Sequence, residues 1–230
     1  MAGEQDQMSS SILRHRFGSV ALCLILVISA DCQRRSEPRV LQTPTPPAAT
    51  QKPLPPNTSP QLKQLVESAI DQTKVTTGYD PAYVGIDYPG GDVPLETGVC
   101  SDVVVRAFRK AGIDLQKEIH DDMVRAWSVY PRKWGASRPD SNIDHRRVLN
   151  LMTYFDRQGK TLPITANRDD YLPGDVVTWD LSSGIEHIGI MVNTWSDAGK
   201  GYMIVHNIGA GARTEEVLLN WKITGHYRYF

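Results

Sequence analysis

The order in which helix-like and strand-like patterns follow one another constrains the fold of this chain more than any other feature. Between residues 59 and 158, apolar residues recur at helical spacing, whereas β-branched and apolar runs separated by turn residues dominate from residue 176 onward. Helices first and antiparallel strands later predict an α+β domain. We expect helices over 60–70, 98–111, 121–130 and 144–158, and strands over 176–180, 187–193, 202–208 and 226–230.

Residues 1–32 have the pattern of an export signal. A basic stretch precedes an almost wholly apolar run over 20–28, which is too short to cross a membrane and is followed by small residues. Cleavage after Ala30 would release a soluble protein, whereas lipidation of Cys32 would tether it to a membrane. The sequence leaves both outcomes open, and it also leaves open whether translation starts at Met1 or Met8.

Residues 33–58 form a segment in which proline recurs and large apolar side chains are few. Such a composition cannot bury a core and favours extended backbone, which gives a semi-rigid spacer. We therefore expect a linker over 33–58 and one folded domain over 59–230.

Composition excludes several classes of partner. The formal net charge is -1 and the sequence pI is about 6.6, so no basic surface for nucleic acid is predicted. His120, Asp121, Asp122 and His145 lack the spacing of a metal site, and a solvated helix start explains them better. We expect a monomer with no cofactor, no bound metal and no nucleic-acid partner.

Cys100 is the candidate nucleophile. It is the one cysteine of three that lies in the body of the chain, in the first turn of a predicted helix that Thr97 would cap. The positive end of the helix dipole favours the reactive thiolate there. The competing interpretation is an inert thiol buried in the core.

His187 is the candidate general base, and His206 is the candidate group that orients it. If Asn193 pairs with Tyr202 across a hairpin, His206 faces Gly189 and becomes a diagonal neighbour of His187. A slip of one residue would put Asn207 there instead. The pattern predicts a Cys–His–His triad of nucleophile, base and orienting residue.

Several segments resemble the NlpC-type cell-wall peptidases of the papain-like clan. Tyr88 to Pro94 and Val99 to Ser101 resemble the region around that family's nucleophile, 172–177 resembles its Pro-Gly-Asp turn, and 186–190 its His-Val-Gly-Ile strand. The whole domain is still more similar to a bacterial envelope family known as domain of unknown function 1287. Segments 98–102, 142–147 and 225–229 carry that second resemblance.

The resemblance implies a papain-like domain with its nucleophile helix packed on an antiparallel sheet, and a peptidoglycan or other peptide substrate in the cell envelope. It also implies that Tyr88 lines the site. From side-chain chemistry, Arg146 or Arg147 would suit a substrate carboxylate. Ser101 could touch substrate, and Asp102 could do the same, although a hydrogen bond to backbone in the first helical turn explains Asp102 better. Val99 and Asp102 depart from the family's motif, and the segment over 112–162 is longer than usual, so substrate specificity cannot be carried over. An acyltransferase with the same triad and a non-catalytic envelope-binding module remain alternatives.

Overall fold

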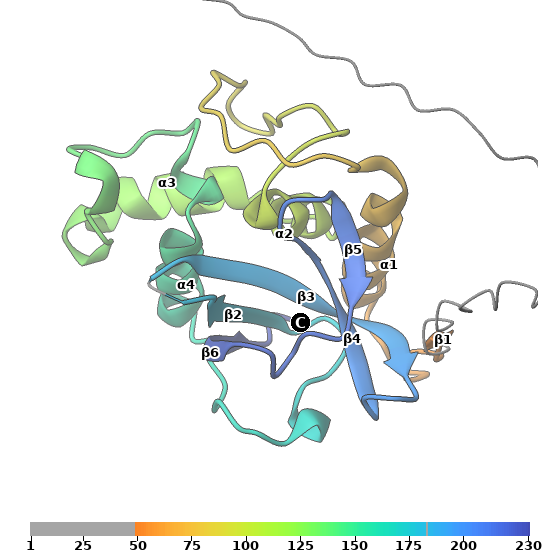
Figure 1. The fold of residues 1–230 in the computed structure, drawn as a ribbon. Coiled ribbons are helices and arrows are strands. Elements are labelled where there is room, and N and C mark those ends of the chain that lie inside the picture. The colour runs from red at the N-terminus through yellow and green to blue at the C-terminus, as the bar shows by residue number, and fades with distance from the viewer. Residues whose placement is uncertain (1–48, 183) are drawn as a thin grey trace, which may run out of the picture. The chain divides into compact units, whose positions relative to one another are not determined.

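The computed structural model describes residues 49–182 and 184–230, so the predicted export signal and most of the proline-rich segment lie outside the described residues. Four α-helices precede most of the strands along the chain (Figure 1). The helices are α1 (Pro60–Val75), α2 (Cys100–Lys110), α3 (Leu115–Ala126) and α4 (Val148–Arg157). The strands are β1 (Ala49–Gln51), β2 (Val176–Asp180), β3 (Glu186–Ser196), β4 (Gly201–Asn207), β5 (Ala212–Glu215) and β6 (Lys222–Tyr227).

One antiparallel sheet organises the domain. Its strands follow the order β5-β4-β3-β2-β6, and β1 pairs with the far end of β3. The α+β class predicted from the order of patterns is therefore confirmed. Several predicted boundaries are wrong: among them, the last strand begins at Lys222 and ends at Tyr227, and the third helix begins at Leu115, where Asp114 caps it.

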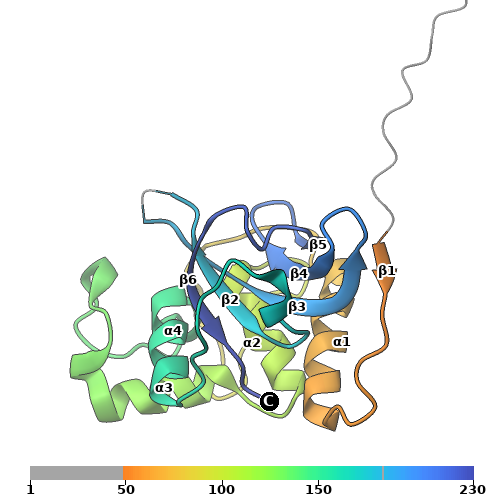
Figure 2. The ribbon, with the colours of Figure 1, turned by 90° about the horizontal axis from the view of Figure 1, so that it is seen from below.

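The sheet carries a core on each face. The helices lie on one side of it (Figure 2), where Phe108 of α2 and Phe155 of α4 pack near Ile188 and Ile190 of β3. On the other face, Trp179 belongs to a smaller cluster that covers β2, β3 and β4. Burial of each large apolar side chain stabilises the fold by roughly 1.5–3 kcal/mol.

The helix that starts with Cys100 is capped differently from our prediction. Its N-cap residue is Val99, not Thr97, whose hydroxyl instead lies against the carbonyl of Pro94. The Asp102 carboxylate accepts a hydrogen bond of 2.7 Å from the backbone N–H of Val99, which satisfies one of the donors that a helix start leaves free.

Part of the predicted linker belongs to the folded domain. β1 pairs residue by residue with β3, and the backbone N–H of Lys52 donates to Asn193 at 2.8 Å. The Lys52 ammonium lies 3.1 Å from the ring centre of Trp195, a cation–π contact. The predicted domain start at Ser59 is therefore too late, because a free sheet edge on β3 recruits this segment.

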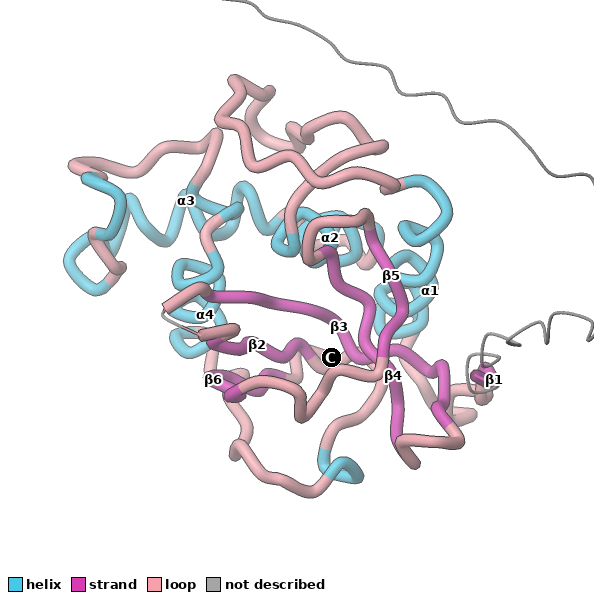
Figure 3. Tube along the Cα trace, viewed as in Figure 1, coloured by secondary structure: helices cyan, strands magenta, loops and turns pink. Residues whose placement is uncertain are grey.

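The chain between α3 and α4 forms an excursion of loops and short 3-10 turns (Figure 3). It contains the turns Trp127–Val129, Lys133–Gly135 and Asp144–Arg146. The predicted helix start at Asp144 is therefore a separate turn, and Arg147 is the N-cap of α4. None of the helices within residues 49–182 and 184–230 is both long enough and apolar enough to cross a membrane.

Candidate active site

Cys100 is the first residue of α2 and lies where β3 and β4 separate. The ladder between these strands ends at the pair Ile190–Val205, so the backbone of Ile188 is free on that side. Its backbone group, with those of Cys100 and Ser101, lies near enough to the thiol to lower its pKa. Cys100 is 7 % exposed. The nucleophile candidate thus lies at the end of a helix, surrounded by backbone donors.

Burial nevertheless raises the pKa of the Cys100 thiol to about 11, more than the three backbone donors lower it. The negative charge of Asp102 raises this pKa further. The helix start does favour the thiolate, as predicted, but burial outweighs it in the resting protein. Burying the thiolate charge costs more free energy than its interaction with the helix dipole contributes.

His187 and His206 are brought together as predicted. The Nε2 atom of His187 lies 2.8 Å from Nδ1 of His206. On the other side of the His206 ring, Nε2 lies 2.9 Å from a carboxylate oxygen of Glu215, although no hydrogen bond with good angles is formed there. The carboxylate of Glu215 favours the tautomer of His206 that carries its proton on Nε2. In that tautomer Nδ1 of His206 is an acceptor, so His187 donates to it through Nε2. Its Nδ1 then carries the lone pair that a general base needs.

Burial disfavours the protonated form of both imidazoles. Burial, and then the charge of His206, lowers the pKa of His187 to about 3. Burial also lowers the pKa of His206, against the opposing charge of Glu215. The two rings contact Trp221 edge-on, with centroids 6.1 and 6.3 Å away.

The two histidines and Cys100 belong to different faces of the sheet. His187 pairs with Trp179 of the smaller core, whereas Ile188 packs in the same cluster as Cys100. Within the described residues, no hydrogen bond joins the Cys100 thiol to His187. The thiol adjoins the backbone of Ile188, one residue after His187, at the open end of the ladder.

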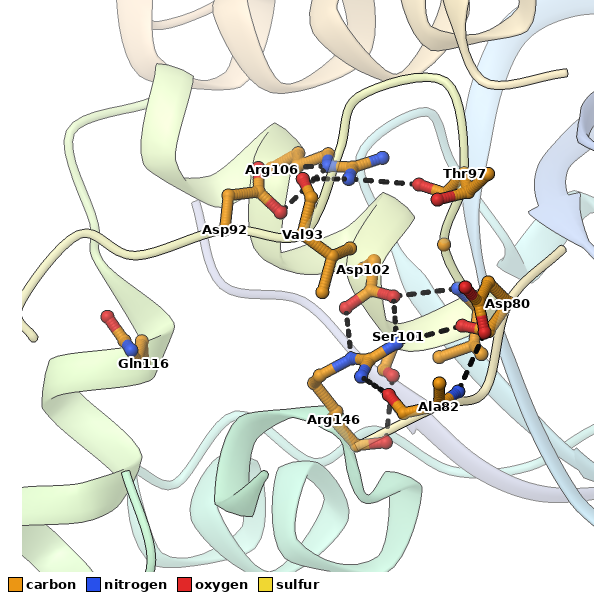
Figure 4. A network of polar contacts seen from close by, with 12 residues as sticks. Asp80, Ala82, Asp92, Val93, Thr97, Ser101, Asp102, Arg106, Gln116 and Arg146 are labelled. Carbon is orange, nitrogen blue, oxygen red and sulfur yellow. Dashed lines mark hydrogen bonds and ion pairs between the residues drawn. The ribbon is translucent and has the colours of Figure 1, made fainter. Parts of the chain in front are cut away.

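Arg146, Asp102 and Ser101 form an internal network instead of facing solvent (Figure 4). The guanidinium binds the Asp102 carboxylate through Nε at 2.9 Å and Nη2 at 3.0 Å, and it donates to the carbonyls of Ala82 and Asp80. Ser101 donates its hydroxyl to the Arg146 carbonyl at 2.9 Å. These groups are already used in holding the loop before α2 and the turn before α4.

Gly98 and Asn207 complete this support. Gly98 has φ +153°, and a Cβ there would come within 3.1 Å of the Asp102 side chain, so only glycine fits. The Asn207 amide donates to the carbonyls of Gly98 and Gly78 at 2.9 and 3.0 Å. Asn207, the alternative orienting residue, thus points to the loop before Cys100 and not to His187.

A cavity of about 330 Å³ opens in front of Cys100. Tyr79 lines it, whereas Tyr88 bonds to Asp121 at 2.7 Å and is absent from its wall. Burial, with the charges of Cys100 and Asp102, raises the pKa of Tyr79. Tyr79 and Tyr88 lie in the same loop over 76–97, and nothing in their sequence spacing indicates which of them lines the cavity. The remaining lining residues are Pro81, Val99, Trp134, Ile143, Arg146, Arg147, Val148, Gly184, Ile185 and Glu186.

The residues that the structure describes contain no cluster of three or more His, Cys, Asp or Glu side chains able to hold a metal ion. His120 contacts Asp144 at 3.1 Å, and His145 is buried with its Nδ1 unpartnered. Asp175 accepts from the backbone N–H of Leu172, as a turn-capping residue would, and it also binds His226 and Arg228.

The chain belongs to the family described as Domain of unknown function (DUF1287), whose model matches residues 66–229. This confirms the family predicted from the sequence. The uncharacterized protein YijF of Escherichia coli (strain K12) is 53% identical over 166 residues, which cover 72% of this chain and 80% of that protein.

Two solved structures show weaker likeness. One is a protein similar to lipoprotein of the NLP/P60 family from Staphylococcus aureus subsp. aureus Mu50, 16% identical, with a TM-score of 0.35 over 71% of this chain and 41% of that one. This chain thus spans less than half the length of the staphylococcal protein. The other is an N-acetylmuramoyl-L-alanine amidase from Bacteroides uniformis ATCC 8492, 14% identical, with a TM-score of 0.41 over 74% of this chain and 98% of that one.

Proposed function

We propose that this protein is a cysteine hydrolase that cleaves an amide bond, with Cys100 as nucleophile, His187 as general base and His206 as orienting residue. One observation carries the proposal: the Cys100 thiol borders a cavity and adjoins the backbone of β3 one residue after His187, which contacts His206 of β4. A thiol beside backbone donors, with a candidate base on the next strand residue, is the set of groups that acyl transfer needs.

The resting state is a thiol beside a neutral imidazole. His187 Nδ1 takes the thiol proton as sulfur attacks the carbonyl carbon, and the backbone N–H groups of Cys100 and Ser101 stabilise the oxyanion. The C–N bond then breaks, and the proton passes from His187 to the leaving amine. Water attacks the thioester and gives its proton to His187, which returns it to the sulfur. This mechanism requires the thiol and the imidazole, which are not hydrogen-bonded in the resting protein, to come together when substrate binds.

The substrate we propose is the stem peptide of peptidoglycan. The N-terminal pattern would export the chain to the periplasm or envelope, free or tethered through Cys32, where such peptides are present. An acyltransferase would use the same residues with an amine in place of water.

A second candidate is a non-catalytic envelope-binding module, because the thiol has a raised pKa and no hydrogen bond to His187. The deciding experiment mixes the full-length protein with purified peptidoglycan and identifies released fragments by mass spectrometry. New fragments from the wild type, absent with Cys100→Ala and reduced with His187→Gln, support a wall hydrolase. His226→Gln is the matched control, because His226 is equally buried but bonded to Asp175. Binding without fragments would favour the module.

A further inference from the structure

Two cavities meet at the same three residues. The cavity of about 330 Å³ that contains Cys100 and a second of about 250 Å³ share Trp134, Ile143 and Arg147. The second cavity lies under the excursion between α3 and α4, with Arg138 and Asn150 in its wall. A ligand attached at Cys100 therefore has a second space beside it, and Arg147 borders both.

Arg147 carries a half-buried charge with no acceptor. Its guanidinium lies 4.5 Å from the ring centre of Trp134, and no carboxylate or carbonyl among the described residues binds it. Burial, and then the charge of Arg146, lowers the pKa of Arg147. Stacking leaves the donor edge of a guanidinium free to bind a carboxylate with two hydrogen bonds.

Trp134, the stacking partner, has an unusual backbone conformation next to an ion pair. Lys133 binds Glu186, next to His187, at 2.6 Å, and Trp134 itself has φ 63°, which a bulky side chain rarely adopts. Strained conformations persist where surrounding contacts impose them, and they gather at binding sites. The second cavity also contains an unused acceptor, since the side-chain oxygen of Asn150, a residue 3 % exposed, has no partner.

We propose that Arg147, stacked on Trp134, binds a carboxylate of the substrate, and that the second cavity holds the residue bearing that carboxylate. The unpartnered oxygen of Asn150 accepts an N–H or O–H from the same residue. The ligand class is a peptide with a free carboxylate close to the bond that Cys100 attacks. This inference rests on the proposed function only in taking Cys100 as the reacting group.

The test measures alkylation of Cys100 and needs no turnover. The full-length protein is treated with N-bromoacetyl-alanine and, separately, with N-bromoacetyl-alaninamide, and the rate ratio is measured by mass spectrometry of the Cys100 peptide. The two reagents differ only in the carboxylate. We expect the wild type to favour the carboxylate reagent, and Arg147→Gln to lower the rate ratio roughly tenfold, the effect of one charge-assisted contact.

Arg132→Gln is the matched control, because Arg132 lies on the same excursion, exposed, and borders neither cavity. It removes the same charge and should leave the ratio unchanged. The proposal would be overturned if the wild type and Arg147→Gln gave the same rate ratio for the two reagents. It would also be overturned if Arg132→Gln lowered that ratio as much as Arg147→Gln does.

If Cys100 reacts with neither reagent, calorimetry with N-acetyl-alanine and N-acetyl-alaninamide on Cys100→Ala decides. Preference for the carboxylate that is lost in the Arg147→Gln background supports the subsite, and no preference refutes it. If the protein hydrolyses no peptide but its Cys100 still reacts faster with the carboxylate reagent, the hydrolase is rejected and the subsite is kept. If the protein hydrolyses peptide but Cys100 reacts equally fast with both reagents, the subsite is rejected and the hydrolase is kept.

Discussion

Arg146 and Arg147 are neighbours in sequence and opposites in environment. The guanidinium of Arg146 is buried and makes four hydrogen bonds, two of them to Asp102. Arg147 stacks on Trp134 at the border of two cavities, and none of the described residues gives it an acceptor. A charge whose hydrogen bonds are all made within the fold supports the framework, whereas a charge with free donors is available to a ligand.

The sequence alone left either arginine open as the carboxylate partner. The structure separates them because Ser101 and Asp102 of α2 turn toward Arg146 and occupy it. The comparison therefore predicts unequal effects on stability and on binding, which can be measured separately.

The largest expected effect is on folding. Arg146→Met leaves the buried Asp102 carboxylate without its partner, and we expect the free energy of unfolding to fall by about 3–5 kcal/mol. Denaturant titration followed by circular dichroism measures it. A loss below 1 kcal/mol would mean that the network around Asp102 contributes little to the framework.

A second effect concerns the pH dependence of stability, which depends on buried histidines that have no carboxylate bound to them. The folded-state pKa values of His187 and His145 are lowered to about 3 and about 4, whereas in the unfolded chain both are near 6.5. Between these limits the unfolded chain binds more protons, so stability rises with pH and is lost on acidification below about 6.5. Each histidine contributes about 1 kcal/mol per pH unit. Melting curves from pH 7 to 4 test this, and His187→Asn should flatten the dependence; an unchanged slope in that variant would contradict it.

A third, smaller effect concerns the two tyrosines of the loop before α2. Tyr79→Phe should lower the turnover of peptide substrate by a few-fold to about tenfold, as expected for the loss of one hydrogen bond near the reacting atoms. Tyr88→Phe should leave it unchanged, because that hydroxyl binds Asp121 of α3. Steady-state kinetics of both variants make the comparison, and equal effects would place neither tyrosine at the site.

The smallest expected effect is on the stability of Arg147 variants. Arg147→Met should shift the free energy of unfolding by no more than about 0.5 kcal/mol, because no partner is left unpaired. The same denaturant titration serves, with Arg146→Met as the contrasting variant. A loss comparable to that of Arg146→Met would erase the distinction between the two arginines.

The sequence predicted the parts of the fold that depend on local periodicity. Strand alternation correctly predicted the register near the histidines: the ladder ends at Ile190–Val205, a Cβ at Gly189 would lie 3.1 Å from His206 Cβ, and His187 and His206 meet. A bulge between Met191 and Trp195 shifts the register toward the hairpin end, where the predicted pairing of Asn193 with Tyr202 is wrong. No local pattern marks such a bulge.

Features that depend on distant contacts could not be read from the sequence. The pairing of β1 with β3 requires a free sheet edge, and the position of Tyr79 in the cavity depends on how the loop before α2 crosses the molecule. The high pKa of the Cys100 thiol arises from burial by other elements, which the helix-start position alone did not reveal.

Acylation of Cys100 tests the central claim most directly. The full-length protein is mixed with a synthetic stem peptide, quenched in acid within the first turnovers, and its intact mass and Cys100 peptide are measured. We predict a transient mass increase equal to the acyl part of the peptide, located on Cys100 and strongly reduced in His187→Gln. Cleavage of the peptide at an undiminished rate by Cys100→Ala, with no adduct on the wild type, would contradict the account.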